Sequence, residues 1–215
     1  MKVTIYTLNV RGLNDPAKVS RLRNYIHNLQ SAPDILMLQE HKLTGEKAAN
    51  LGRQLNPSST YLYAEARPGY RNHIRGSGAG CGGTAFLIRN SLDRFVINSG
   101  SIYNVRALWM ILGNIAECSW GLLHVYSPND ANERKVFWNS IPDNLPLDCH
   151  WLVGGDFNMV ESSTDKSSAC GRLLCEPEKS VWNGLKTALN ISDSFSFRHS
   201  PGTMGGFMAK EFLHV

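Results

Sequence analysis

The sequence predicts a mixed α/β fold in which strands and helices alternate within one domain that spans residues 1–215. Short runs of apolar or alternating residues, typical of strands, are separated by segments whose apolar residues recur at helical spacing. The 215 residues are 42% hydrophobic and 19% charged, a composition that can fill a sizeable core. No internal repeat and no linker-like break in composition interrupts the pattern.

The predicted elements begin with a strand and a helix. Residues 2–9 alternate in polarity and are rich in β-branched side chains, which predicts a strand. Asp15 and Pro16 then predict a helix start, because aspartate is favoured at the N-cap and proline in the first turn. The same patterns predict further strands at residues 34–39, 61–66, 84–89, 106–112, 120–126 and 150–154, and further helices at residues 44–55, 132–145 and 176–189.

Charge is unevenly distributed along the chain. Residues 1–106 carry 14 basic and 6 acidic side chains, whereas residues 107–215 carry 8 basic and 12 acidic ones. Residues 67–83 hold seven glycines or prolines and three arginines, which predicts a mobile basic loop. A basic half and an acidic half would suit a metal-dependent enzyme that acts on a polyanion, because arginines bind phosphates and carboxylates bind the metal. A solvated surface with chance asymmetry is the plainer explanation, and charge alone slightly favours it.

Composition also excludes several classes of protein. No apolar run approaches the roughly 18 residues of a membrane span, and residues 1–15 lack the apolar core of a signal peptide. The five cysteines are an odd number without CxxC spacing, which predicts free thiols in a reducing compartment. We therefore expect an intracellular protein with no membrane partner.

Polar side chains follow three of the predicted strands at the point where each strand ends. Asn9 ends the first strand, and Glu40 directly follows the second. Asp156 and Asn158 follow the strand over residues 150–154. Each is a common turn or loop residue by itself, but ligands in α/β folds gather at the carboxyl ends of strands. Two carboxylates there suit Mg²⁺, which takes one or two protein carboxylates and keeps several waters.

Strand alternation predicts where these side chains point. Asn9 has the parity of Thr7, and Glu40 has the parity of Leu38, so each follows a face expected to be buried. We therefore expect both side chains to emerge at a central cleft, together with Asp156.

Five short segments resemble the endonuclease/exonuclease/phosphatase superfamily, and within it the endonuclease domain of non-LTR (LINE-type) retrotransposons. In chain order they are LNVRGLN (8–14), LQEHKL (38–43), GGTAFLI (82–88), HVYSPND (124–130) and GGDFNMVES (154–162). The ordered set is far more specific than any member. The apurinic-site repair branch usually has an acid where Arg11 stands, so the retroelement branch is the better match. The resemblance implies a four-layer α/β sandwich of two mainly antiparallel sheets flanked by helices.

The resemblance also implies catalytic roles. Glu40 matches the metal-binding glutamate, and Asn9 matches the asparagine that helps to hold the metal and its water. The implied cofactor is Mg²⁺, with Mn²⁺ as a substitute. Asp156 matches the aspartate that orients or deprotonates the attacking water, and Asn158 matches the asparagine that contacts the transition-state phosphate. His41, beside Glu40, is expected at the surface.

Other residues are expected to contact the substrate. Tyr126 matches the tyrosine whose hydroxyl contacts the scissile phosphate, and Asn129 is the nearby asparagine of the same motif. Arg71 and Arg75, in the basic segment, are expected to bind DNA phosphates.

The resemblance ends at about residue 203. The family closes with a Ser-Asp-His triplet, which this sequence lacks: His199 and His214 follow Asn158, and neither has an adjacent acid. We interpret the tail as a C-terminal truncation and expect a sandwich without its last strands.

Three functions remain open. The first is a Mg²⁺-dependent endonuclease of a retroelement, nuclear in a eukaryote, that nicks DNA, with a reverse transcriptase domain in the parent polyprotein. The second is a superfamily phosphatase that acts on an inositol phosphate or a lipid headgroup. The third is a catalytically dead remnant with at most weak nucleic-acid binding, as the missing triplet would imply.

Overall fold

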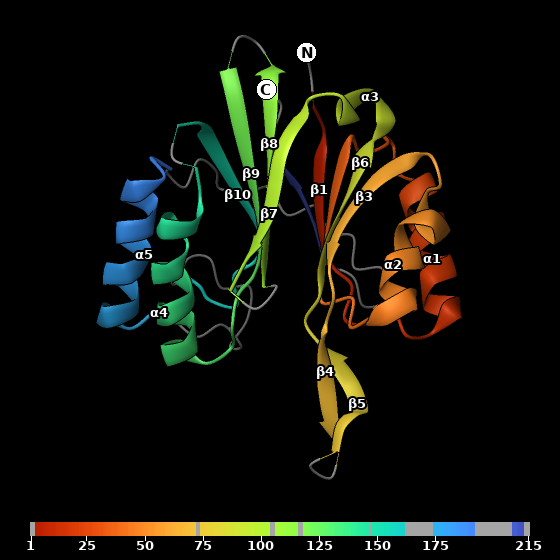
Figure 1. Cartoon of the computed structure of the whole chain (residues 1–215), viewed down its shortest axis with the longest axis horizontal. Coiled ribbons are helices and arrows are strands. Elements are labelled where there is room, and N and C mark those ends of the chain that lie inside the picture. The colour runs from red at the N-terminus through yellow and green to blue at the C-terminus, as the bar shows by residue number, and fades with distance from the viewer. Residues whose placement is uncertain are drawn as a thin grey trace.

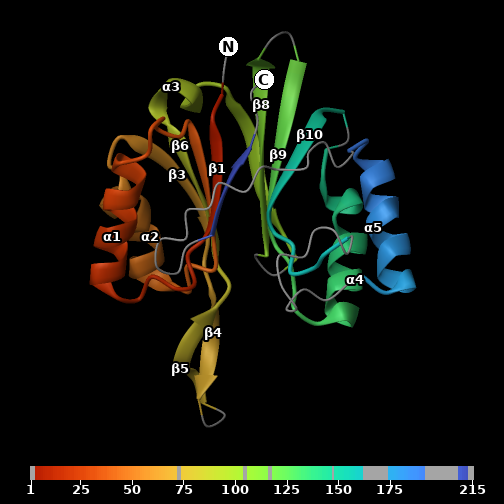
Figure 2. The same ribbon diagram turned by 180° about the vertical axis from the view of Figure 1, so that it is seen from behind.

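Two β-sheets pack face to face, and a pair of helices covers the outer face of each sheet (Figure 1). This computed structural model describes residues 3–71, 74–103, 106–115, 118–146, 148–161, 174–191 and 208–212, without side chains at 69–71, 74–79, 114–115 and 208–212. The view from behind shows the same order of layers: helices, sheet, sheet, helices (Figure 2). The expected four-layer α/β sandwich is confirmed.

The first sheet has the strand order β11-β1-β2-β6-β3. Its strands are β1 (Ile5–Asn9), β2 (Ile35–Gln39), β3 (Ser59–Ala64), β6 (Thr84–Arg89) and β11 (Met208–Phe212). β1 and β2 run parallel, so their carboxyl ends meet at one edge, where Asn9 and Gln39 are register partners. The other three pairings are antiparallel.

The second sheet has the strand order β10-β9-β8-β7. Its strands are β7 (Val96–Ile102), β8 (Ala107–Ile115), β9 (Cys118–Tyr126) and β10 (His150–Asp156). β9 and β10 run parallel, and their last residues, Tyr126 and Asp156, are register partners. Each sheet therefore contains one parallel pair, and both are otherwise antiparallel, as expected.

N-cap aspartates and a proline account for several of the helix ends. They are α1 (Pro16–His27), α2 (Gly45–Leu55), α3 (Asn90–Asp93), α4 (Ala131–Ser140), the 3₁₀ turn η1 (Pro142–Asn144) and α5 (Glu176–Ala188). Asp15 caps α1 by accepting from the Ala17 amide, and Asp130 caps α4. The helix predicted over 132–145 is shorter, because Pro142 cannot continue α4. None of the helices in the described residues is long and apolar enough to cross a membrane.

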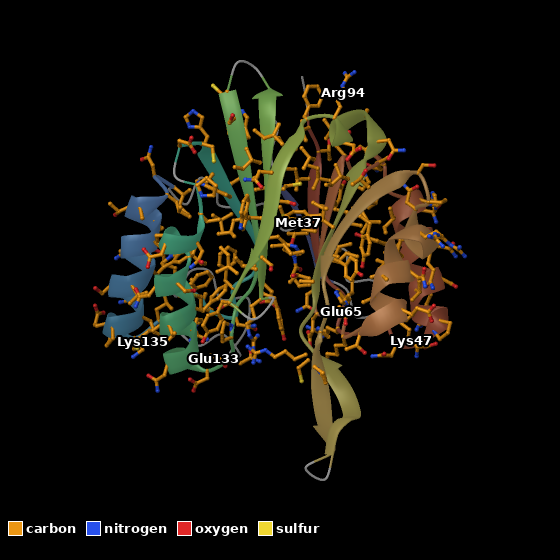
Figure 3. The ribbon with its side chains drawn as sticks, viewed as in Figure 1. Met37, Lys47, Glu65, Arg94, Glu133 and Lys135 are labelled. Atoms are coloured by element: carbon orange, nitrogen blue, oxygen red, sulfur yellow. The ribbon has the colours of Figure 1, made fainter. Side chains whose placement is uncertain are left out.

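Apolar clusters fill the three spaces between the layers. Strand β2 contributes to two of them, because it is buried on both faces. Leu36 and Leu38 pack under α1 and α2, whereas Ile35 and Met37 pack between the sheets (Figure 3 labels Met37). A third cluster, rich in tryptophan, lies between the second sheet, α4 and α5.

The basic segment is not a loop throughout. Its backbone forms a hairpin of β4 (Arg67–Arg71) and β5 (Ile74–Cys81), which projects from the sandwich (Figure 1). The glycines suggested a loop, but irregular antiparallel pairing with shifts in register accommodates them. The hairpin is thus a correction to the expected loop.

The divergent tail contributes a strand that the sequence analysis did not assign. β11 pairs antiparallel with β1 along the edge of the first sheet, with Ile5 opposite Phe212. His199 and His214, considered above, lie outside the described residues.

Candidate active site

Asn9 and Asp156 meet across the gap between the two sheets. Asn9 ends β1 in the first sheet, and Asp156 ends β10 in the second. The Asn9 amide Nδ2 donates to Asp156 Oδ2 at 2.6 Å, and Asn9 Oδ1 accepts from the backbone N–H of Arg11 at 3.0 Å. The hydrogen bond joins the two strand ends and directs the carboxylate toward the first sheet.

Glu40 lies on the loop that follows β2, and this loop has an unusual backbone. Glu40 and Lys42 both adopt positive φ angles of 59°, a conformation that non-glycine residues rarely occupy and that often marks functional sites. The Glu40 carbonyl accepts from the Gly12 N–H at 2.7 Å. Lys42 Nζ lies 2.9 Å from Glu40 Oε1, so this carboxylate is placed where it can hold a cation.

Tyr126 lies at the same edge of the sandwich as both carboxylates. This edge, formed by the carboxyl ends of β1, β2, β9 and β10, is called the rim below. Its side chain is buried, and burial raises the pKa of the phenol to about 12, with further increases from the charges of Glu40 and Asp156. The Arg106 guanidinium, 5.4 Å from the ring centroid, acts in the opposite direction. Tyr126 is the register partner of Asp156, and a Cβ on Gly82, whose carbonyl accepts from the Lys42 N–H, would lie 3.6 Å from the Tyr126 ring.

Asn158 packs beside Asp156 in a tight turn. Its backbone N–H donates to Asp156 Oδ1 at 3.0 Å, and its side-chain Nδ2 donates to the Ser127 carbonyl at 2.7 Å. Gly155 precedes this turn at φ +138°, where a Cβ would lie 2.0 Å from the Val125 carbonyl oxygen. Only glycine fits there, so the GGD sequence allows the close approach of β10 to β9.

The structure brings together five of the expected site residues on one rim, at the carboxyl ends of β1, β2, β9 and β10. They are Asn9, Glu40, Tyr126, Asp156 and Asn158. Asn129 is exposed, and its backbone carbonyl accepts from Arg134. The side chains of Arg71 and Arg75 lie outside the described part of the structure.

His41 is buried, so its expected place at the surface is wrong. Its Nδ1 accepts from the Leu43 N–H at 3.1 Å, which leaves Nε2 to donate to the Ala64 carbonyl at 3.1 Å. Burial lowers the pKa of His41, and its backbone hydrogen bonds oppose that effect only in part. A Cβ on Gly83 would lie 2.5 Å from this ring. The neutral imidazole therefore supports the Glu40 loop from inside.

A buried polar group that the sequence analysis missed lies between the sheets. Gln39 Nε2 donates to Thr7 Oγ1 at 2.6 Å and to His124 Nε2 at 2.6 Å. Burial, and then the nearby His41, lower the pKa of His124 to about 3, so its ring is neutral and carries its proton on Nδ1. The signal was available: Gln39 and His124 are polar residues inside otherwise apolar strands.

The side-chain oxygen atoms of Glu40 and Asn9 fit a magnesium ion. The Glu40 carboxylate and the Asn9 amide oxygen are hard oxygen ligands, the type that Mg²⁺ prefers, and the Lys42 contact shows a cation already balancing Glu40. No group of three or more His, Cys, Asp or Glu side chains in the described residues could enclose a metal. Mg²⁺ typically takes one or two protein carboxylates and keeps several waters, so Glu40 with Asn9 is a sufficient set of protein ligands for it.

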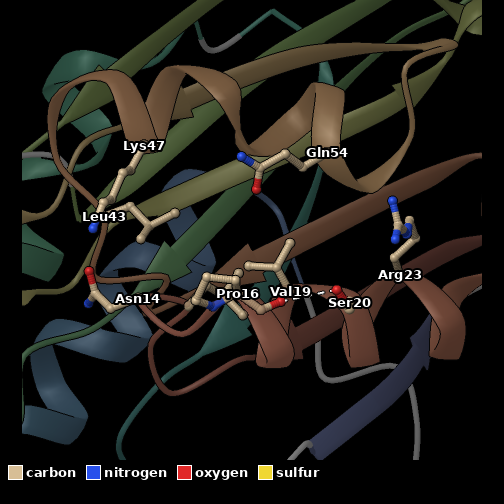
Figure 4. A pocket seen from close by; sticks show the side chains of 9 residues that line it. Asn14, Pro16, Val19, Ser20, Arg23, Leu43, Lys47 and Gln54 are labelled. Atoms are coloured by element: carbon tan, nitrogen blue, oxygen red, sulfur yellow. Dashed lines mark hydrogen bonds between the residues drawn. The ribbon is translucent and has the colours of Figure 1, made fainter.

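A surface pocket lies apart from this rim. It has a volume of about 320 Å³ and opens between α1 and α2 (Figure 4). Its lining includes Leu13, Val19, Leu43 and Lys47, and it contains none of the expected site residues.

The fold is a four-layer α/β sandwich, and solved structures share this architecture. The AP endonuclease LMAP from Leishmania major has a similar structure, with a TM-score of 0.63 and 17% identity over 88% of this chain and 67% of that one. The human nocturnin catalytic domain matches with a TM-score of 0.49 and 15% identity over 74% and 65% of the respective chains.

Residues 6–208 match the model of the endonuclease/exonuclease/phosphatase family, and the chain belongs to that family. The family includes nucleases and phosphatases, and its enzymes typically use divalent metal ions.

Proposed function

We propose that this chain is a Mg²⁺-dependent phosphodiester hydrolase, and specifically the DNA-nicking endonuclease of a retroelement. The observation that carries the proposal is the Asn9–Asp156 hydrogen bond between the two sheets. It holds one carboxylate beside the loop that presents a second carboxylate, Glu40, with the Tyr126 phenol on the same rim.

Each side chain has a distinct task in hydrolysis. Asp156 is held by hydrogen bonds at both oxygens, from Asn9 and from the Asn158 N–H, so its carboxylate is oriented to accept a proton from water. Glu40 and Asn9 would hold Mg²⁺, which neutralises charge on the phosphoryl oxygens. Tyr126 remains protonated at neutral pH because its pKa is about 12, so its O–H donates to a phosphate oxygen.

The basic hairpin supports DNA as the substrate. Its base is bonded to the Glu40 loop, because the Lys42 N–H donates to the Gly82 carbonyl and the Ala66 N–H donates to the Leu43 carbonyl. The arm therefore begins beside the Glu40 loop, and its backbone carries three arginines away from the sandwich (Figure 1), where we propose that they bind DNA phosphates. The sequence resemblance of LNVRGLN (8–14) supports the retroelement branch, and with it a reverse transcriptase in the parent polyprotein.

A plasmid-nicking assay with Mg²⁺ tests the proposal. We expect wild-type protein to convert supercoiled DNA to open circles, and EDTA to stop the reaction. Asp156→Asn and Glu40→Gln should each reduce the rate by about 10²–10⁴-fold, the usual contribution of an acid–base group. Glu176→Gln is the matched control, because Glu176 is an exposed carboxylate on α5 whose side chain is 85% exposed.

The other two functions are outcomes of the same experiment. Release of phosphate from an inositol phosphate, without nicking, would identify a phosphatase. DNA binding that survives EDTA and Glu40→Ala, with no hydrolysis of either substrate, would identify a dead remnant.

A further inference from the structure

Arg134, on α4, lies fully buried behind the loops that carry the site. It is 1% exposed. Its Nη1 donates to the backbone carbonyls of Pro128 and Asn129 at 3.0 Å each, and to that of Asn158 at 3.1 Å. The first two residues follow β9, and the third follows β10. One nitrogen therefore joins the two loops that leave the parallel pair of strands.

The other side of the guanidinium is bound to a single carboxylate. Nε donates to Glu178 Oε1 at 3.0 Å, and Nη2 donates to the same oxygen. Burial raises the pKa of Glu178, but hydrogen bonds from Cys175 and Arg134 outweigh this effect, and the pKa lies below its ordinary value. Glu178 is therefore ionised and balances the buried cation, which links α4 to the first turn of α5.

We call Arg134, with Glu178 and the loop carbonyls that it binds, the clamp. The clamp is connected to Asp156, the proposed general base, through Asn158. Asn158 has a φ of +48°, and in this conformation its N–H points at Asp156 Oδ1. The Ser127 N–H donates to the Asp156 carbonyl at 2.8 Å, and Asn158 Nδ2 donates to the Ser127 carbonyl. Both loops thus contact Asp156, and Arg134 contacts both loops.

We propose that Arg134 is a positioning residue that orients the Asp156 carboxylate through Asn158, with Glu178 as its counter-charge. This positioning role requires a planar group with N–H donors on several sides. The guanidinium of arginine is such a group, whereas the ammonium of lysine is not. This inference rests on the proposed function, in which Asp156 activates water. The clamp itself is a feature of the fold, so it can be tested without catalysis.

The experiment uses the double variant Arg134→Met/Glu178→Gln, which removes both buried charges together and so avoids leaving one unpaired. Amide hydrogen exchange at Ser127 and Asn158 should become about tenfold faster or more, because local opening of the two loops requires less free energy. The kcat for nicking should fall about 10–100-fold while KM changes by less than about twofold, since the base is misplaced but the DNA surface is intact.

Two further variants make the result specific. Arg134→Lys keeps the charge but not the planar guanidinium. We expect it to resemble the double variant both in amide exchange and in kcat. Arg89→Met is the matched control: Arg89 joins Asp34 at 2.9 Å and the Ala32 carbonyl at 3.1 Å, beside the start of β2, opposite the end where Glu40 lies. It should leave exchange at Ser127 and Asn158, and kcat, unchanged.

The possible results separate the two proposals. Wild-type exchange and kcat in a folded double variant, or in Arg134→Lys, would overturn the positioning role, as would equal changes in kcat and KM. If the wild-type protein nicks no DNA, the proposed function fails, whereas faster exchange in the variants would still establish the clamp.

Discussion

Gln39 and His124 are joined by a 2.6 Å hydrogen bond that crosses the space between the two sheets. Gln39 immediately precedes Glu40, and His124 lies two residues before Tyr126. Each sheet therefore carries one partner of a buried polar contact directly behind the rim. His124 carries its proton on Nδ1, so a second proton would have to go on Nε2, which already accepts from Gln39. Because Nδ1 has no partner among the described residues, the resulting charge would be uncompensated in the core.

We expect His124 to make the fold sensitive to acid. Its pKa is about 3 in the folded protein and about 6.5 when exposed, so between these values the unfolded chain binds more protons. The stability is complete above pH 6.5 and is lost as the pH falls toward 3, by at most about 5 kcal/mol for this group.

Urea unfolding at several pH values measures this effect. The free energy of unfolding of His124→Gln should decline less between pH 7 and pH 4 than that of the wild type. Carboxylates contribute equally to both proteins, so the difference reports His124 together with its coupling to His41. Parallel curves for the two proteins would contradict the expectation.

Tyr126 reports the arrangement of the carboxylates without any need for activity. Its pKa of about 12 is raised first by burial and then by Glu40 and Asp156. Glu40→Gln should therefore lower the pKa of this phenol, because one neighbouring negative charge is removed. The pKa is measured as the difference in ultraviolet pH titration between each protein and its Tyr126→Phe derivative. Glu176→Gln serves as the control, and an unchanged pKa in Glu40→Gln would place Glu40 away from the rim.

Gly155 and Gly184 form a matched pair of glycine substitutions. Gly155→Ala should destabilise the protein by about 3 kcal/mol or more, because its Cβ would meet the Val125 carbonyl at 2.0 Å and its φ is +138°. At Gly184, in α5, an added Cβ would meet no atom within 4 Å, so Gly184→Ala should stabilise by about 0.5–1 kcal/mol. Urea unfolding measures both, and a neutral Gly155→Ala would refute the close approach of β10 to β9 at this position.

The hairpin arm should contribute electrostatically to DNA binding. Arg71→Ala/Arg75→Ala should weaken binding and reduce the slope of log K against log salt by about 2, if each arginine neutralises one phosphate. Fluorescence anisotropy with a duplex at several salt concentrations measures the slope. Arg94→Ala is the control, because Arg94 is exposed and lies at the end of the sandwich away from the hairpin (Figure 3). An equal slope in both variants would remove the arm from the DNA surface.

The direction of Glu40 illustrates where alternation along a strand fails. Parity placed Glu40 with Leu36 and Leu38, and those two side chains in fact pack under α1 and α2 rather than between the sheets. The positive φ of Glu40 ends the alternation, and its carboxylate acts on Tyr126 in the other sheet. Asn9 kept its parity with Thr7 because β1 remains regular to its last residue.

The sequence by itself determined most of the regular elements, their order and the residues at the strand ends, because apolar periodicity, N-caps and prolines act over a few residues. It did not predict β4, β5, α3, β7 or β11. Only the tertiary structure decided which of those ends meet. The Asn9–Asp156 bond joins residues 147 positions apart, and the Arg134–Glu178 clamp joins residues 44 apart. Such contacts depend on how two sheets pack, and burial between them turns ordinary polar residues such as Gln39 and His124 into a neutral, hydrogen-bonded support for the rim.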